Sequence, residues 1–166
     1  MSNINKIILI AVIILASIFA IARLAQSPGG QLPVLGEAIT GHGAVLDLSN
    51  QDLKALPASV LSKTNLTELD ISHNQLTGAL PSQIGQLKNL KKLDTSYNQL
   101  TGVPAEMGQL ENLEYLDLSY NKLTGLPNEL ANLKNLKTLN LAGNNYSQQD
   151  LQIIQQKLTN TNFILK

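Results

Sequence analysis

Carboxylates and hydroxyls recur in this sequence at a fixed interval, and one histidine lies beside them. Each recurring aspartate is followed two residues later by a serine, and His73 comes directly after Ser72. Serine, histidine and aspartate together are the residue types of a nucleophilic triad. Asp70, Ser72 and His73 belong to one short extended stretch, however, where adjacent side chains do not converge on one substrate atom. We therefore expect no catalytic triad, and no enzyme.

The recurring carboxylates raise the question of a metal. They are Asp47, Asp70, Asp94 and Asp117, with Asn140 at the next interval. Side by side on strands about 4.8 Å apart, such carboxylates repel one another by about 1 kcal/mol in water. Solvation or bonding to neighbours, a bridging calcium ion or a basic partner would each relieve this repulsion. The column lacks the clustered oxygen ligands of a calcium site, and the chain has no cysteine, so we expect neither metal nor cofactor.

These residues belong to an internal repeat, which must position them. Residues 113–135 read LEYLDLSYNKLTGLPNELANLKN, and residues 66–89 and 90–112 follow the same pattern. Leu113, Leu116 and Leu118 alternate as buried residues of a short strand do. One unit cannot enclose its leucines, whereas stacked units can, each in contact with its neighbours. The strands of such a stack are parallel and need a crossover, here a turn or short helix that begins at proline.

The pattern L-x-x-L-x-L-x-x-N-x-L resembles the leucine-rich repeat family over roughly residues 43–166. Its LTG–P segments are similar to those of plant-receptor and bacterial leucine-rich repeats. The resemblance implies an α/β solenoid: a short horseshoe with a parallel concave sheet of about five strands. It places turns or short 3-10 or α segments on the convex side. It also implies protein–protein recognition, without fixing the partner.

Other positions of the repeat are predicted to be structural. An inward asparagine amide after each strand would satisfy backbone groups of the bend, at Asn74, Asn98, Asn121 and Asn144. Thr95 takes an inward leucine position, where its hydroxyl is free to bond a carbonyl. From about residue 145 we expect a capping helix that begins at Ser147 and buries Leu151, Ile154 and Leu158. The apolar tail 163–165 is expected to join the core.

The outward positions of the strands are the candidate binding residues. Tyr97, Tyr115 and Tyr120 fall on the concave face, and tyrosine is frequent in interface hot spots. The predicted ligand-binding residues are Asp70, His73, Lys92, Asp94, Tyr97, Tyr115, Asp117 and Tyr120. The alternative is that these tyrosines are ordinary residues of the repeat. The corresponding functions are a binding module for a protein or peptide and, as the alternative, a structural or self-associating surface or envelope component.

The N-terminal residues suggest where the repeats reside. Residues 7–22 are apolar apart from Ser17 and follow Lys6, which predicts a signal or anchor segment over residues 1–25. Residues 26–43 are predicted to be a linker and N-terminal flank, and residues 44–166 the repeat domain. We expect a membrane-anchored protein with extracytoplasmic repeats; secretion after cleavage at Ala22 is the alternative. Zero net charge argues against nucleic acid, and a monomer is expected.

Overall fold

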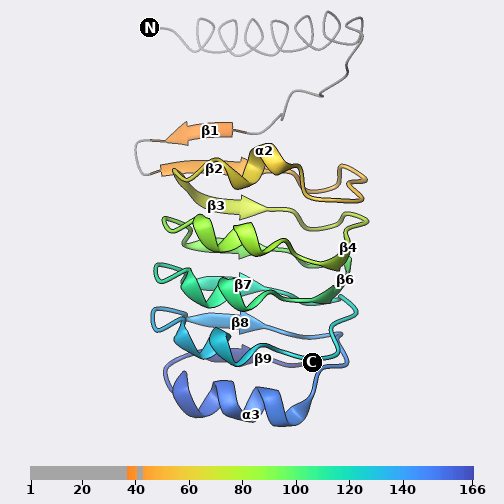
Figure 1. Cartoon of the computed structure of the whole chain (residues 1–166), viewed down its shortest axis with the longest axis vertical. Coiled ribbons are helices and arrows are strands. Elements are labelled where there is room, and N and C mark those ends of the chain that lie inside the picture. The colour runs from red at the N-terminus through yellow and green to blue at the C-terminus, as the bar shows by residue number, and fades with distance from the viewer. Residues whose placement is uncertain (1–36, 41–42) are drawn as a thin grey trace, which may run out of the picture. The chain divides into compact units, whose positions relative to one another are not determined.

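The repeats form one stack of parallel strands. The computed structural model describes residues 37–40 and 43–166. Five strands lie side by side in chain order (Figure 1), namely β2 (Gly43–Asp47), β3 (Leu66–Asp70), β5 (Lys92–Asp94), β7 (Tyr115–Asp117) and β8 (Thr138–Asn140). Strand β9 (Asn162–Ile164) continues the parallel sheet after β8, and β1 (Glu37–Thr40) pairs with β2 in the antiparallel direction. The predicted α/β solenoid and its five repeat strands are confirmed, and β1 and β9 extend the sheet to seven strands.

The register keeps equivalent residues of successive repeats side by side. Leu69 pairs with Leu93, and Leu93 with Leu116. A residue type that recurs at one repeat position therefore becomes a row that runs across the strands. This register turns the periodic sequence into columns of like side chains.

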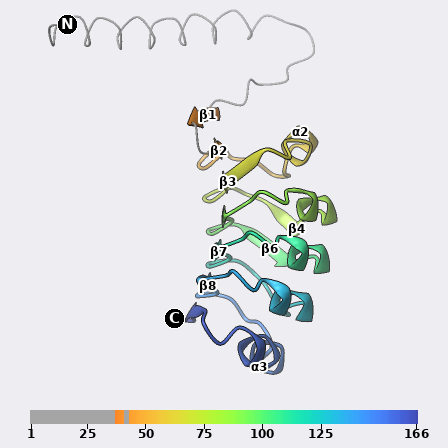
Figure 2. The ribbon, with the colours of Figure 1, turned by 90° about the vertical axis from the view of Figure 1, so that its left-hand side faces the viewer.

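Short helical turns all lie on one side of the sheet (Figure 2). They are α2 (Ala58–Leu61), η1 (Ser82–Gln86), η2 (Ala105–Gln109) and η3 (Asn128–Asn132), the last three being 3-10 helices. Each begins directly after a proline with φ between −59° and −72°, a value that the pyrrolidine ring fixes in advance. Between strands and turns, β4 (Thr77–Ala79) and β6 (Gln99–Gly102) form a second, two-stranded parallel sheet.

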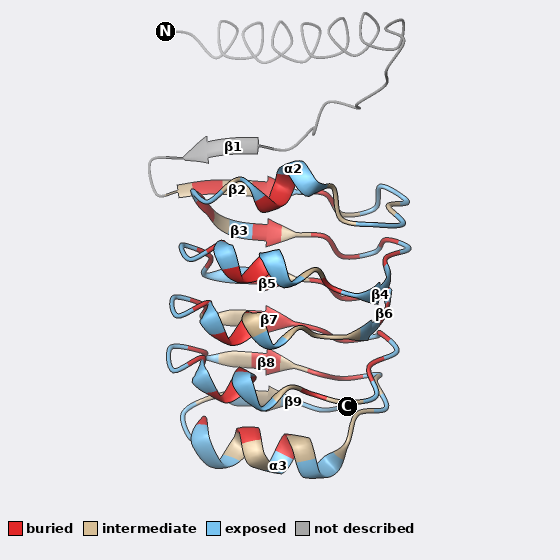
Figure 3. Cartoon of the chain, viewed as in Figure 1, coloured by how far each residue is buried: buried red, intermediate tan, exposed pale blue. Residues whose placement is uncertain are grey.

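The leucines of the repeat form the buried core. Figure 3 shows buried segments both on the strands and on the helical turns. Leu90, Leu93, Leu113, Leu116 and Leu118 are fully buried. Complete burial of a leucine side chain stabilises the fold by about 1.5–3 kcal/mol, so the apolar positions of the pattern account for the stack.

Glycine lets the helical turns approach one another. A Cβ on Gly85 would lie 2.5 Å from the carbonyl oxygen of Glu106, and one on Gly108 would lie 2.2 Å from that of Glu129. Both distances are below 3.0 Å, and nonbonded contacts of a Cβ atom are essentially never this short. The first unit carries Leu61 at this position of the repeat, and α2 packs less closely on η1 than the later turns pack on one another.

A helix closes the last repeat, as expected. The hydroxyl oxygen of Ser147 accepts a hydrogen bond from the backbone N–H of Asp150, 3.3 Å away, at the start of α3 (Gln148–Lys157). Leu151, Ile154 and Leu158 are buried, and the predicted capping helix is confirmed.

The expectation that the tail 163–165 is buried is wrong. Phe163 pairs with Leu139 on the inward row and is half-buried, while Ile164 pairs with Asn140 on the outward row. Ile164 and Leu165 are each 37% exposed. The period of two along β9 therefore directs Ile164 toward solvent.

The predicted signal or anchor segment lies outside the described residues. The same holds for most of the predicted linker, whose last part contains β1. Among the described residues, no helix combines the length and apolar character needed to cross a membrane. A membrane anchor over residues 1–25 stays a prediction.

Candidate recognition surface

Three outward rows run across the strands and the turns that follow them. The first row contains Glu68, Lys92, Tyr115 and Thr138. The second, here named the carboxylate row, contains Asp47, Asp70, Asp94, Asp117 and Asn140. The third follows three residues after the second and contains Asn50, His73, Tyr97, Tyr120 and Gly143. We call the surface made by the three rows the sheet face.

The aromatic residues of the third row form a continuous stack. The ring centroids of His73 and Tyr97 are 4.3 Å apart with planes 9° from parallel, and those of Tyr97 and Tyr120 are 4.4 Å apart at 14°. Gly143 makes room for the last ring, because a Cβ there would lie 2.7 Å from Cδ1 of Tyr120. Tyr97 is 47% and Tyr120 49% exposed. This ring stack (His73, Tyr97 and Tyr120) therefore shows its edges and hydroxyls to solvent, while neighbours cover most of its ring faces.

The backbone under the ring stack is left-handed. Asn50, His73, Tyr97 and Tyr120 have φ between 50° and 55°, and Gly143 has φ of 69°. Asparagine and glycine adopt this conformation readily, whereas for other residues it costs about 1–2 kcal/mol. The tyrosines thus occupy a position where smaller residues would be more stable. Such strain at an exposed position is typical of functional residues.

Sequence reasoning placed these rings together but missed their backbone conformation. The available signal was Asn50 and Gly143 at the same repeat position, since these two residue types are the usual ones at positive φ.

Backbone hydrogen bonds connect each of these turns to the next. The N–H of Tyr97 donates to the carbonyl of Ser119 (3.0 Å), and the N–H of Tyr120 donates to the carbonyl of Ala142 (2.7 Å).

The aspartates of the carboxylate row fold back on their own turns. Oδ1 of Asp70 accepts from the N–H of Ser72 at 2.9 Å, and Oδ1 of Asp94 accepts from the N–H and the hydroxyl of Ser96 at 3.0 and 2.7 Å. Asp47 makes the same bond to Ser49. The second oxygen, Oδ2, of Asp47, Asp70 and Asp94 has no hydrogen-bond partner within residues 43–166. These oxygens are free to accept from a ligand.

Asp117 differs, and the expectation that it faces solvent is wrong. It is buried, with 6% of its surface exposed. Its Oδ1 accepts from Ser119, while its Oδ2 accepts from the hydroxyl of Tyr115 at 3.0 Å and from Nδ2 of Asn140 at 2.8 Å. Because both oxygens are occupied from inside the chain, Asp117 supports the face and is not among the open carboxylates.

The three rows of the sheet face carry five carboxylates and one lysine, namely Asp47, Glu68, Asp70, Asp94 and Asp117, and Lys92. Partial burial raises the pKa of Asp94; hydrogen bonds from Ser96 oppose this rise, and the charges of Asp117 and Asp70 add to it. The pKa of Tyr115 is raised to about 12, first by burial and then by the charge and the hydrogen bond of Asp117. Desolvation, followed by Tyr120 and the charge of Asp117, also raises the pKa of Tyr97. Tyr97 and Tyr115 therefore keep their protons at neutral pH.

Lys92 is the lysine among the predicted binding residues, and it forms no ion pair with the carboxylates of the described residues. Its Nζ lies over the ring of Tyr115, 5.7 Å from the centroid, a cation–π contact. Within residues 43–166 the structure has one ion pair, between Lys137 and Glu114, which lowers the pKa of Glu114. Asp70 and Asp94 therefore remain without a cation in the described part of the chain.

The inward asparagines tie each repeat to the one before it. Nδ2 of Asn98 donates to the carbonyl of Ile71 at 2.9 Å, and its Oδ1 accepts from the N–H of Leu76 at 2.9 Å. Equivalent bonds are made by Asn74, Asn121 and Asn144. In the same core, the buried hydroxyl of Thr95 donates to the carbonyl of Asp117 at 3.1 Å. These residues are structural and lie apart from the sheet face.

A second asparagine ladder was missed by sequence reasoning. It follows the helical turns, where each Nδ2 donates to a carbonyl of the preceding repeat, from Asn89, Asn112 and Asn135. The signal was in the sequence, because each repeat ends in LKN or LEN at the same spacing.

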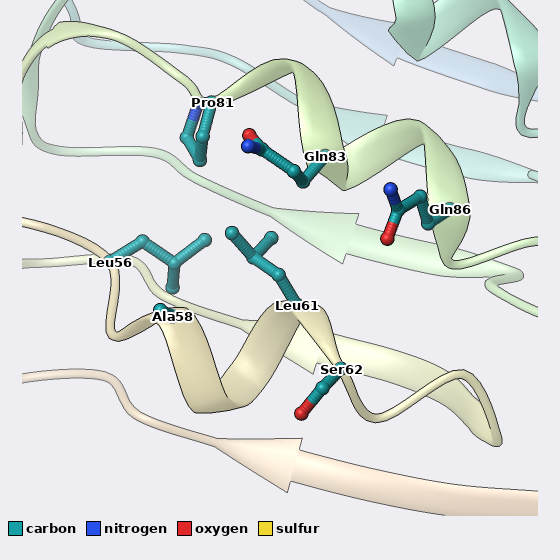
Figure 4. Close-up of a pocket in the computed structure, with 7 residues that line it drawn as sticks. All are labelled: Leu56, Ala58, Leu61, Ser62, Pro81, Gln83 and Gln86. Carbon is teal, nitrogen blue, oxygen red and sulfur yellow. The ribbon is translucent and has the colours of Figure 1, made fainter.

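A hollow of about 400 Å³ lies between α2 and η1, away from the sheet face (Figure 4). Its lining combines Leu56, Leu61 and Pro81 with the uncharged polar side chains of Gln83, Gln86 and Ser62. It coincides with the place where Leu61 replaces glycine, so we interpret it as a packing gap of the first repeat. Elsewhere in the described residues, no cluster of three or more His, Asp or Glu side chains is placed to hold a metal ion.

Taken together, the chain is a repeat solenoid with an exposed aromatic and acidic sheet face. The family profile described as "Leucine rich repeat" matches residues 88–145, and "Leucine Rich repeats (2 copies)" matches residues 64–105. The predicted resemblance is confirmed: the chain is a leucine-rich-repeat protein. No curated protein sequence matches it.

Solved structures of leucine-rich-repeat proteins are similar to this chain. A leucine-rich-repeat protein of Leptospira interrogans is 34% identical over 68% of this chain and 34% of its own, with a TM-score of 0.56. The ectodomain of the Arabidopsis thaliana receptor kinase GASSHO1/SCHENGEN3, solved with CASPARIAN STRIP INTEGRITY FACTOR 2, is 32% identical over 67% of this chain and 14% of its own, with a TM-score of 0.59. The ectodomain of the receptor kinase SOBIR1 of Arabidopsis thaliana is 28% identical over 90% of this chain and 89% of its own, with a TM-score of 0.61. The chain thus spans only a third and a seventh of the first two.

Proposed function

We propose that this protein is a non-catalytic recognition module that binds a protein or peptide through its sheet face. The observation that carries the proposal is the exposed ring stack on left-handed backbone. Two tyrosines remain about half exposed at positions where asparagine or glycine would be less strained. Large, rigid and amphipathic tyrosine side chains are typical of interface hot spots.

The geometry of the ring stack favours a peptide over a carbohydrate. A sugar packs on an open aromatic face, and the faces of Tyr97 are covered by His73 on one side and Tyr120 on the other. Ring edges and hydroxyls instead suit the side chains and carbonyl groups of a polypeptide. The similar receptor ectodomain that was solved with an integrity factor supports this choice of partner.

Display outside the cytoplasmic membrane is the second part of the proposal. It is supported by the apolar sequence of residues 7–22 after Lys6 and by the similarity to ectodomains of plant receptors. Retention as an anchor leaves the full mass of the chain, whereas cleavage after Ala22 removes 22 residues. Mass spectrometry of the mature protein distinguishes the two.

Capture of partners with the full chain tests the recognition role. Tyr97→Asn plus Tyr120→Asn removes two rings and installs the residue that Asn50 already carries at this conformation, so the fold should persist. Tyr146→Asn makes the same chemical change outside the ring stack and is the matched control. Proteins retained by the wild type and the control but lost from the double variant support the proposal. Equal retention by all three contradicts it.

Self-association is the alternative. It is favoured by the exposed apolar side chains of Ile164, at the end of β9, and of Leu165, which follows it. Sedimentation of the purified chain over a range of concentrations separates the two functions. A monomer at all concentrations supports recognition of another molecule. Assembly that grows with concentration and persists in Tyr97→Asn plus Tyr120→Asn supports the structural role.

A further inference from the structure

The chemistry of the partner can be narrowed from the charges beside the ring stack. Asp47, Asp70 and Asp94 lie in one row, and each keeps Oδ2 unbonded within the described residues. Adjacent strands hold neighbouring carboxylates about 4.8 Å apart, a spacing at which one cation can contact two of them. A hollow of about 170 Å³ lined by Asp47, Glu68, Asp70 and Lys92 lies over this part of the sheet.

The carboxylates and the ring stack lie close enough to act on one ligand. The two rows are three residues apart in each repeat and run parallel across the strands. A ligand that crosses the strands along the carboxylate row therefore passes beside the ring edges.

The face already holds one cation of its own. Lys92 extends along the sheet and places Nζ over the ring of Tyr115, whose hydroxyl is bonded to Asp117. This arrangement of an aliphatic stem, an aromatic ring and a nearby carboxylate is internal to the protein. It shows that a basic side chain fits the sheet face beside its tyrosines. Within the described residues, no basic side chain is bonded to Oδ2 of Asp70 or Asp94.

We propose that the partner presents an extended basic segment, with an arginine that pairs with Asp70 and Asp94 while its aliphatic stem packs along the edges of the ring stack. This rests on the proposed recognition function and specifies its ligand class. The arginine guanidinium presents a planar fork of donors that matches carboxylate oxygens, and arginine stems cover apolar surface while their charged ends stay in water. Exclusion of water by the stem strengthens the ion pair, because the attraction increases as the local dielectric constant falls.

The charge balance of the face favours this partner over an acidic one. The sheet face carries the carboxylates of Asp47, Asp70, Asp94 and Glu68 and one lysine, Lys92, and like charges on adjacent strands repel one another. An incoming cation removes this repulsion, whereas an acidic segment increases it. Nucleic acid is disfavoured for the same reason.

Selection of twelve-residue peptides from a randomised display library against the full chain tests the ligand class. We expect the enriched peptides to contain arginine more often than the starting library. The selected peptides should bind Asp70→Asn plus Asp94→Asn about tenfold more weakly than the wild type. Asparagine keeps the oxygen that the serine N–H needs, as Asn140 shows in the fifth repeat by accepting from Ala142. Melting curves of the variants verify that the fold is kept.

Glu111→Gln plus Glu129→Gln is the matched control, since it removes two carboxylates outside the sheet face and changes net charge equally. Unchanged affinity of this control, together with the tenfold loss, supports the proposal. Enriched peptides that are neutral or acidic, and that lose affinity only on Tyr97→Asn plus Tyr120→Asn, overturn the basic partner and leave the recognition function standing. Failure to enrich any peptide that depends on the sheet face contradicts both.

Discussion

Replacing Asn98 by alanine tests the asparagine ladder that fixes the repeats on one another. Oδ1 of Asn98 accepts from the N–H of Leu76, and the two protons of its Nδ2 are shared among three carbonyls, of Ile71, Thr95 and Ser96. The expected loss of stability depends on how many of these groups lose their last partner.

The three carbonyls keep a partner in the variant. Ile71 still accepts from Asn74 at 3.0 Å, Thr95 from Asn121 at 3.0 Å, and Ser96 from the N–H of His73 at 2.9 Å. The N–H of Leu76 has Asn98 as its acceptor and is buried with its residue. One orphaned buried donor costs about 1–3 kcal/mol, so we expect the free energy of unfolding of Asn98→Ala to fall by about 2 kcal/mol.

Urea denaturation of the full chain measures this loss, and thermal unfolding should show a midpoint lower by about 4–8 °C. Asn112→Ala is the control, because Asn112 is exposed and makes one bond, to the carbonyl of Lys88, that water can replace. Its cost should stay below about 0.5 kcal/mol. Equal effects of the two substitutions, or a loss below 0.5 kcal/mol for Asn98→Ala, would refute the ladder as a stabilising element.

Three further substitutions test the packing, the electrostatics and the cap. Gly108→Ala places a Cβ 2.2 Å from the carbonyl oxygen of Glu129 and should lower the free energy of unfolding by about 1–3 kcal/mol; an unchanged denaturation midpoint would show that the helical turns are free to move apart. The pKa of Asp94 is raised in the folded state, so its contribution to stability is present below the ordinary pKa and is lost as pH rises through the raised value. Asp94→Asn should therefore be more stable than the wild type at pH 7, by less than about 1 kcal/mol because the group is partly solvated. Near pH 3 the two proteins should be equally stable. A gain in stability that is the same at both pH values would contradict the raised pKa of Asp94 as its cause. Ser147→Ala removes the acceptor at the start of α3 and should cost about 1 kcal/mol, while Ser147→Asp should restore stability if capping is the reason.

The rows of side chains across the strands were predictable from the sequence, because each row consists of residues at one position of the repeat. A strand has a side-chain period of two, and residues such as Leu93 and Asp94 fall on opposite sides of the sheet whatever their neighbours are. In-register stacking then places Tyr97 beside Tyr120. Both the core and the candidate surface follow from these two regularities.

Deviations within a row depend on which residues neighbouring repeats contribute. Asp117 is buried because Tyr115 turns its hydroxyl back and Asn140 of the next repeat supplies an amide; the other aspartates lack this pair. The exposure of Ile164 follows from the register of β9, which lies beyond the repeat and has no pattern of its own. Left-handed backbone at Tyr97 and Tyr120 goes against the preference of tyrosine, so only Asn50 and Gly143 hinted at it.

The central claim is that the ring stack is the recognition element and that the fold does not need it. Its most direct test measures the affinity of a captured partner for the wild type, for Tyr97→Asn plus Tyr120→Asn, and for Tyr146→Asn, beside a melting curve of each. We expect the double variant to bind at least tenfold more weakly with a melting temperature within a few degrees of the wild type, and the control to bind as the wild type does. Undiminished binding by a folded double variant would contradict the claim.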